Sequence, residues 1–242
     1  MVGMIFAAGL GTRLKPLTDT MPKALVPLAG KPLLQWQVEK LRNAGITDII
    51  VNVHHFPDQI IDTIRANEGW GCHITVSDER NLLLDTGGGL RKAKSSIFNL
   101  HSSILEPILA CNVDILSNIN IKDLVRAYEQ TGVSQLVVSD RQTQRYLCFD
   151  EQDQLCGWTN IKTGEVKGRD GRHLAFSGCQ IVSPETLALL SQMPDEKFSL
   201  IDFYLNVLNE VPLHAYVPSN YRMMDVGKID QIEEAEAFAE SL

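Results

Sequence analysis

The chain has 242 residues, and its 44% hydrophobic and 21% charged residues are ordinary for a soluble globular protein of one α/β domain. A formal net charge of −8 argues against an extended nucleic-acid surface, so an anionic ligand needs a local group of cations. The five cysteines form no Cys-x-x-Cys pair, which indicates reduced thiols in a cytoplasmic protein rather than a disulfide framework or a zinc site. Because no apolar run reaches membrane-spanning length and the start lacks a signal-peptide pattern, we expect no membrane partner.

A short apolar segment, residues 4–8, predicts a buried first strand, and a glycine-rich loop follows it. The residues of interest in this loop are Ala8, Gly9, Gly11, Thr12 and Arg13. Glycines at the end of a strand let backbone N–H groups turn toward an anion without obstruction by side chains. Arg13, and Lys23 later on the same connection, add positive charge at the same place. These features predict a binding site for a nucleoside triphosphate.

Two common glycine-rich motifs do not fit this loop. A dinucleotide-binding fingerprint requires a glycine at the sixth position from Gly9, where the chain has Leu14. A P-loop requires Ser or Thr after Gly-Lys, but the two Gly-Lys pairs of the chain continue into Pro32 and Ile229. A plain glycine-rich turn remains the alternative interpretation.

The first half of the chain alternates predicted strands with predicted helices. The predicted helices cover residues 32–44, 57–67, 86–97 and 121–130. The predicted strands cover residues 46–53, 72–76, 106–111 and 135–139. Repeated β-α units imply a parallel sheet with right-handed crossovers. Ligands of such sheets bind at the carboxyl ends of the strands, where we expect Gly9, Asp114 and the segment after Val53 to converge.

The second half contains shorter segments. Antiparallel hairpins are predicted for residues 146–149, 155–159 and 165–167. A buried strand at 174–182, helices at 184–192 and 200–209, a strand at 213–217 and a final helix at 228–239 follow. The predicted fold class is therefore α/β and Rossmann-like, with a mainly parallel central sheet, helices on both faces and a small antiparallel hairpin subregion, all in a single domain 1–242.

Several motifs resemble the signature of sugar-1-phosphate nucleotidylyltransferases, which join a sugar 1-phosphate to a nucleoside triphosphate and release pyrophosphate. These motifs are residues 7–13, Thr18, Pro22-Lys23 and residues 27–33. Residues 85–89 and 176–178 are most similar to the N-acetylmuramate-1-phosphate uridylyltransferase branch, and residues 225–227 resemble an ending shared with mannose-1-phosphate guanylyltransferases. The resemblance covers nearly the whole chain. It implies the nucleotide-diphospho-sugar transferase fold, with a nucleotide-binding half 1–140 and a sugar-binding half 141–242.

The resemblance implies that Arg13 and Lys23 are catalytic. The attacking phosphate monoester is already anionic, so no general base is required, and the difficulty is to neutralise charge as pyrophosphate leaves. The guanidinium of Arg13 suits the β and γ phosphates, and Lys23 suits the phosphates around the reacting α phosphorus. A solvated lysine is the alternative for Lys23.

Two aspartates are the predicted metal ligands. Asp114 follows the buried run 108–111, and Asp225 follows a second apolar segment. Two carboxylates that face a triphosphate suit Mg²⁺, which is the predicted cofactor. An ordinary capping aspartate is the alternative for either residue.

The remaining predicted contacts are assigned by the resemblance. The nucleotide would be bound by Ala8, Gly9, Gly11, Thr12, Asp85, Thr86, Gly87 and Asn112. The sugar phosphate would be bound by Asn160, Lys162 and Gly178. Many relatives have Glu where this chain has Asn160, which indicates a different sugar. A hairpin turn over residues 160–164 is the alternative interpretation.

We therefore predict an enzyme that transfers a nucleoside monophosphate from a nucleoside triphosphate to a sugar 1-phosphate with Mg²⁺. The preferred substrates are UTP and N-acetylmuramate or N-acetylhexosamine 1-phosphate. One alternative is GTP with mannose or heptose 1-phosphate, and another is a non-catalytic nucleotide-sensing domain. We expect a monomer or homodimer without a nucleic-acid partner, and no hexapeptide-repeat domain after the final helix.

Overall fold

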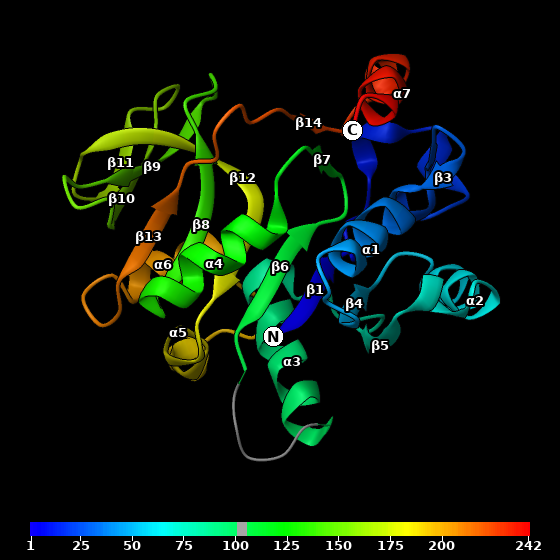
Figure 1. The fold of residues 1–242 in the computed structure, drawn as a ribbon, viewed down its shortest axis with the longest axis horizontal. Coiled ribbons are helices and arrows are strands. Elements are labelled where there is room, and N and C mark those ends of the chain that lie inside the picture. The colour runs from blue at the N-terminus through cyan, green and yellow to red at the C-terminus, as the bar shows by residue number, and fades with distance from the viewer. Residues whose placement is uncertain (101–105) are drawn as a thin grey trace.

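The structure is a computed structural model that describes residues 1–100 and 106–242. Its centre is a ten-stranded sheet (Figure 1). The strands are β1 (Val2–Phe6), β4 (Asp48–Val53), β5 (His73–Asp78), β6 (Ile108–Asn112), β8 (Ser134–Ser139), β9 (Arg145–Phe149), β10 (Leu155–Asn160), β11 (Glu165–Gly168), β12 (Arg172–Val182) and β13 (Leu213–Tyr216). Their order is β11-β10-β9-β12-β6-β1-β4-β5, and β8 pairs with β12 and β13.

The helices cover both faces of this sheet because successive residues of each strand point to opposite sides. Ile5 of β1 belongs to one hydrophobic core, and its neighbour Met4 belongs to the other. The first core includes residues of α1 (Leu33–Asn43), α2 (Pro57–Ala66), α4 (Ile121–Thr131) and α7 (Ile232–Glu240). The second includes residues of α3 (Asp85–Leu100), α5 (Pro184–Ala188) and α6 (Leu200–Asn206). The predicted helix-covered sheet is confirmed. Within the described residues, no helix is long and apolar enough to cross a membrane.

The first half of the chain contains the parallel part of the sheet. β1 pairs in parallel with β4 and β6, and β4 pairs in parallel with β5. All five residues of β1 are buried, as expected for a strand with helices on both faces. The predicted parallel arrangement of these strands is confirmed.

The second half departs from this pattern at β12, which runs antiparallel to β6, β8 and β9. β9, β10 and β11 form the predicted antiparallel hairpins. The predicted strand at 135–139 is present as β8 and pairs in parallel with β13, but it does not pair directly with β6, because β12 is inserted between β6 and β8. Nearly all of β12 after His173 is buried, so it needs partners along both edges. The two halves therefore share this long strand (Figure 1).

Two short strand pairs were not predicted. β2 (Pro27–Leu28) pairs with β3 (Lys31–Pro32), so the first helix begins at Leu33 rather than at Pro32. β7 (Ile115–Ser117) pairs with β14 (Met223–Asp225), which sets Asp225 opposite Ile115. This second pair brings the C-terminal aspartate beside the end of β6.

Several predicted helices are shorter than expected. The segment 184–192 is α5 followed by a 3₁₀ turn, Leu189–Gln192. In the segment 200–209 the helix α6 ends at Asn206. The final helix α7 is preceded by the 3₁₀ turn Ile229–Gln231. These differences shift element ends without changing the order of the elements.

Candidate active site

A cavity of about 330 Å³ opens at the carboxyl ends of β1, β4 and β6, within the usual size range of small-molecule sites. It is lined by Phe6, Ala8, Gly9, Lys23, Asn52, Leu83, Asp85, Thr86, Asn112, Val113, Asp114 and Lys197. The predicted site residues outside this lining are Gly11, Thr12, Arg13, Gly87, Asn160, Lys162, Gly178 and Asp225. The expected position at the strand ends is confirmed for Gly9 and Asp114.

Gly11 and Gly9 have different structural roles in the loop after β1. Gly11 has φ of +65°, and a Cβ there would come 2.8 Å from Cγ2 of Thr18 and 3.0 Å from Cβ of Lys23. Thr18 Oγ1 also donates a hydrogen bond to the Gly11 carbonyl, 2.8 Å away. Only glycine therefore fits at position 11. A Cβ on Gly9 would meet nothing within 4 Å, and Gly9 lines the cavity, so a side chain there would occupy ligand space.

Two cation–carboxylate pairs lie side by side, one in the cavity lining and the other outside it. Lys23 Nζ donates to Asp114 Oδ2, and Arg13 Nη2 lies 3.9 Å from Asp225 Oδ2. The backbone joins the pairs, since Val226 N donates to the Asp114 carbonyl at 2.8 Å. The Lys23 side chain is only 9% exposed, whereas that of Arg13 is 60% exposed. Lys23 is thus held in a fixed position, while Arg13 remains free to reach a ligand.

The electrostatics of Asp225 fit a divalent cation. Burial raises the pKa of Asp225, and the negative charge of Asp114 raises it further, while Lys23 and Arg13 act in the opposite direction. A cation shared by the two carboxylates would remove this repulsion. Carboxylate oxygens beside a space for phosphates are the donors that Mg²⁺ takes, so the residues present fit the predicted ion.

The first turn of α3 packs against residues 196–198. Asp85 has φ of +62° and its Oδ1 accepts a hydrogen bond from Thr86 N at 2.6 Å. A Cβ on Gly87 would come 2.4 Å from the ring of Phe198, and Gly87 N donates to the Phe198 carbonyl at 2.9 Å. The glycine is therefore required by this close approach. Nucleotide contact by Gly87 stays a prediction. The packing of Phe198 against Gly87 also brings the neighbouring residue Lys197 to the cavity.

A buried polar network that the sequence interpretation missed supports the cavity wall. Asn52 Oδ1 accepts from Ala7 N, and Asn52 Nδ2 donates to Glu79 Oε1, both at 2.8 Å. Glu79 Oε2 accepts from Leu84 N at 3.1 Å, and burial raises the pKa of Glu79. The network ties the loop after β1 to β4 and to the loop before α3. Asn52 could have been noticed as the polar residue in an apolar strand, whereas Lys197 lies in a polar stretch without any such signal.

The predicted sugar-side residues do not gather at this cavity. Asn160 Oδ1 accepts from Lys162 N at 3.1 Å, and the Asn160 carbonyl accepts from Gly164 N at 2.8 Å. Asn160 therefore forms the turn between β10 and β11, as the alternative interpretation expected, and its role in sugar binding stays a prediction. Gly178 has φ of +66° in the irregular part of β12, and a Cβ there would come 2.9 Å from Asn112 Nδ2. Gly178 thus borders the cavity through Asn112.

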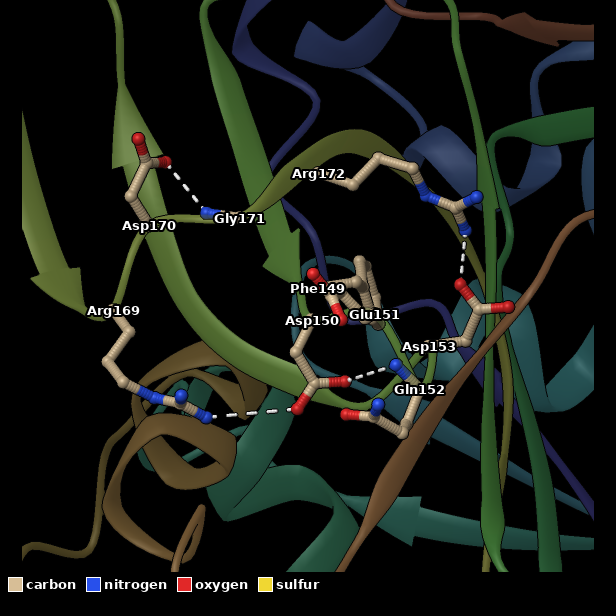
Figure 2. Close-up of a pocket in the computed structure, with 9 residues that line it drawn as sticks. All are labelled: Phe149, Asp150, Glu151, Gln152, Asp153, Arg169, Asp170, Gly171 and Arg172. Carbon is tan, nitrogen blue, oxygen red and sulfur yellow. Dashed lines mark hydrogen bonds and ion pairs between the residues drawn. The ribbon is translucent and has the colours of Figure 1, made fainter.

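A larger cavity, about 640 Å³, lies at the end of the hairpin region (Figure 2). Figure 2 shows its arginines paired with aspartates of the same cavity: Arg172 Nη2 is 2.6 Å from Asp153 Oδ1, and Arg169 Nη2 is 3.8 Å from Asp150 Oδ2. This cavity does not include the glycine-rich loop or the carboxyl ends of the parallel strands. The cavity lined by Gly9, Lys23 and Asp114 is therefore the better site for a triphosphate.

Comparison with known proteins decides the family. Residues 2–155 match the family model of nucleotidyl transferases. The chain belongs to this family. It is 30% identical over 212 residues to an N-acetylmuramate alpha-1-phosphate uridylyltransferase of Caulobacter vibrioides, which covers 84% of this chain and 82% of that protein. It is 33% identical over 231 residues to mannose-1-phosphate guanyltransferase 2 of Candida glabrata, which covers 94% of this chain and 62% of that protein.

A solved structure with the same fold is that of a putative glucose-1-phosphate thymidylyltransferase from Bacillus anthracis. It superposes with a TM-score of 0.83 at 16% identity, over 100% of this chain and 96% of that chain. The family and fold class predicted from the sequence are confirmed. Within this nucleotidyl transferase, the matched segment contains Gly9, Lys23 and Asp114, whereas Lys197 and Asp225 come from beyond it.

Proposed function

We propose that this chain transfers a nucleoside monophosphate from a nucleoside triphosphate to a sugar 1-phosphate and releases pyrophosphate. The observation that carries the proposal is the contact of the buried Lys23 side chain with Asp114 in the cavity that Gly9 and Asp85 also line. It places a fixed cation and a metal-type carboxylate together beside a loop suited to phosphates. A binding domain without catalysis could lose that combination, so its presence favours catalysis.

The chemistry of the reaction matches the side chains. The sugar phosphate is ionised at neutral pH, so the protein must mainly hold two anions together and neutralise charge in the transition state. Lys23 is suited to the α phosphorus because its side chain is buried and oriented before substrate arrives. Arg13 is exposed on the adjoining turn, and its several donors suit the departing β and γ phosphates.

Asp114 and Asp225 would hold Mg²⁺ in this proposal. When bound, the ion supplies charge neutralisation for the triphosphate and for the leaving pyrophosphate. Lys23 orients the Asp114 carboxylate, and Arg13 lies beside the Asp225 carboxylate. Both cations are therefore already close to the oxygens that would bind the ion.

For the substrates, we propose UTP with N-acetylmuramate or N-acetylhexosamine 1-phosphate. This choice is supported by the similarity to the Caulobacter uridylyltransferase, which extends over most of both chains. The resemblance of residues 85–89 to that branch also supports it. The second candidate, GTP with mannose 1-phosphate, is supported by the match to the Candida guanyltransferase over nearly all of this chain.

A substrate matrix tests these proposals. The purified chain with Mg²⁺ would receive each of four nucleoside triphosphates with N-acetylmuramate, N-acetylglucosamine, mannose and heptose 1-phosphates, and pyrophosphate release would be measured. We expect kcat/KM to be highest for UTP with an N-acetylated sugar, by at least about tenfold. A maximum for GTP with mannose 1-phosphate would select the second candidate. No release with any pair would contradict catalysis and leave a nucleotide-binding domain.

Gly9 offers a test that separates ligand binding from folding. We expect Gly9→Leu to raise the KM for the triphosphate at least about tenfold, because the new side chain would fill cavity space. The melting temperature should stay within about 2 °C, since a Cβ at this position meets nothing. Gly11→Ala is the contrasting variant and should lower the melting temperature, because its Cβ would meet Thr18 and Lys23. Equal destabilisation of the two variants would contradict the assignment of Gly9 to ligand space.

A further inference from the structure

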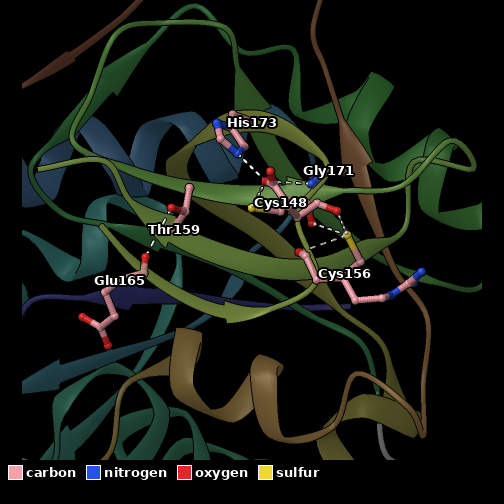
Figure 3. Close-up of polar contacts among 8 residues, drawn as sticks. Cys148, Cys156, Thr159, Glu165, Gly171 and His173 are labelled. Atoms are coloured by element: carbon pink, nitrogen blue, oxygen red, sulfur yellow. Dashed lines mark hydrogen bonds and ion pairs between the residues drawn. The ribbon is translucent and has the colours of Figure 1, made fainter. Parts of the chain in front are cut away.

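A cluster of three metal-ligating side chains lies in the hairpin region, formed by residues that do not line the cavity at the glycine-rich loop. Cys148 of β9 stands directly opposite His173 of β12 in the antiparallel register (Figure 3). Asp170 comes from the connection between β11 and β12. One thiol sulfur, one carboxylate oxygen and one imidazole nitrogen all lie within 4.8 Å of one another. Strand pairing thus assembles a donor set from positions that are distant in the sequence.

Neighbouring groups hold these donors in place. His173 Nε2 lies 2.7 Å from Asp170 Oδ1, and the same oxygen accepts from Gly171 N at 2.9 Å. The His173 ring stacks on Tyr146, with centroids 5.6 Å apart and planes 19° apart. The Cys148 sulfur is 3.9 Å from Asp170 Oδ1. The Gly171 N–H and the Tyr146 ring lie outside the donor set and orient Asp170 and His173, and outer contacts of this kind strengthen metal sites.

We propose that Cys148, Asp170 and His173 bind a divalent cation of the Zn²⁺ type. Sulfur, nitrogen and carboxylate oxygen are the donors of zinc, which takes four ligands in tetrahedral geometry. Asp170 and His173 are exposed, so water can supply the fourth ligand. Mg²⁺ prefers oxygen donors alone and would not compete at a site with a thiolate. The two metal sites of the chain would thus select different ions.

Binding of a metal ion would change the protonation of the Cys148 thiol and would anchor the connection 169–171. Burial raises the pKa of Cys148 to about 11, with a further contribution from Asp170, so without metal the thiol is protonated. A bound cation replaces that proton, which passes to solvent as the sulfur–metal bond forms. The ion would also link the connection 169–171, which lines the cavity in Figure 2, to β9 and β12.

The test uses the full chain without an affinity tag, stripped of metal by chelation and titrated with Co²⁺ in excess Mg²⁺. Co²⁺ reports a thiolate ligand by a near-ultraviolet charge-transfer band and tetrahedral geometry by visible bands. We expect the charge-transfer band and the visible bands to reach their maximum at one Co²⁺ per chain. Both should disappear when Zn²⁺ displaces Co²⁺. Cys148→Ser should remove the charge-transfer band. His173→Gln and Asp170→Asn should weaken binding at least about tenfold. Cys156→Ser, on the neighbouring strand β10, is the control and should keep the band.

Absence of the band at one equivalent of Co²⁺ would overturn the proposal. So would a band that survives Cys148→Ser and disappears in Cys156→Ser. Circular dichroism checks that each variant is folded. If Cys148→Ser fails to fold, the variants of the exposed His173 and Asp170 decide the outcome, and unchanged Co²⁺ affinity in both overturns the site. The readout does not involve nucleotidyl transfer, so this proposal and the proposed function fail independently.

Discussion

Replacing Lys23 by alanine is expected to lower kcat for pyrophosphate release by about 10²- to 10³-fold. The reason is that Lys23 is a buried cation of the cavity, already oriented by Asp114, so its charge acts on the transition state without prior reorganisation. Asp114 retains 22% side-chain exposure, so its carboxylate can be hydrated and the variant should still fold. Steady-state kinetics and a melting curve together measure these effects.

The matched control is Lys15→Ala. Lys15 has the same charge and follows the same loop, but its side chain is 61% exposed and pairs with Asp19 outside the cavity lining. Its activity should remain within about twofold of the parent chain, since exposed ion pairs contribute little. Lys23→Ala with activity close to that of Lys15→Ala would remove Lys23 from the mechanism and leave the fold intact.

Converting Asp114 or Asp225 to asparagine is expected to raise the Mg²⁺ concentration for half-maximal activity by at least about tenfold. Each change removes one of two neighbouring carboxylates whose negative charges repel each other, and this repulsion contributes to the raised pKa of Asp225. An amide oxygen is a weaker ligand for Mg²⁺ than a carboxylate. Activity measured against Mg²⁺ concentration gives the shift directly.

Asp62→Asn is the control for this experiment, because Asp62 is an exposed residue of α2 that pairs with Arg65, away from the cavity lining. It should leave the Mg²⁺ dependence unchanged. If Asp114→Asn and Asp225→Asn behave like Asp62→Asn, the two carboxylates do not hold the ion, and the metal assignment is wrong while the role of Lys23 stands.

Local chemistry explains which parts of the site the sequence could predict. Gly9 follows a short apolar strand and Asp114 follows another, and parallel strands place their carboxyl ends at one edge. The cavity could therefore be located from strand order alone. Asp225 was identified by resemblance, but its position depends on the pairing of β14 with β7, more than a hundred residues apart in the chain.

Long-range pairing also explains what was missed. The insertion of β12 between β6 and β8 joins segments whose local patterns contain no sign of it. Lys197 reaches the cavity because Phe198 packs against Gly87, a contact between distant loops. Cys148 and His173 meet through strand register, so the spacing of the cysteines in the sequence contains no sign of the cluster that we propose as a metal site.

The strand shared by the two halves also limits how the molecule can move. β12 is bonded to β6 through Cys179–Val182 and to β9 through Arg172–Leu174, so one continuous backbone spans both halves. Swinging the halves apart would break several backbone hydrogen bonds at once, each worth about 1 kcal/mol or more when left unsatisfied. We therefore expect substrate entry and product release to rely on connecting loops, such as residues 193–199 with Lys197 at the cavity, rather than on opening of the sheet along this strand.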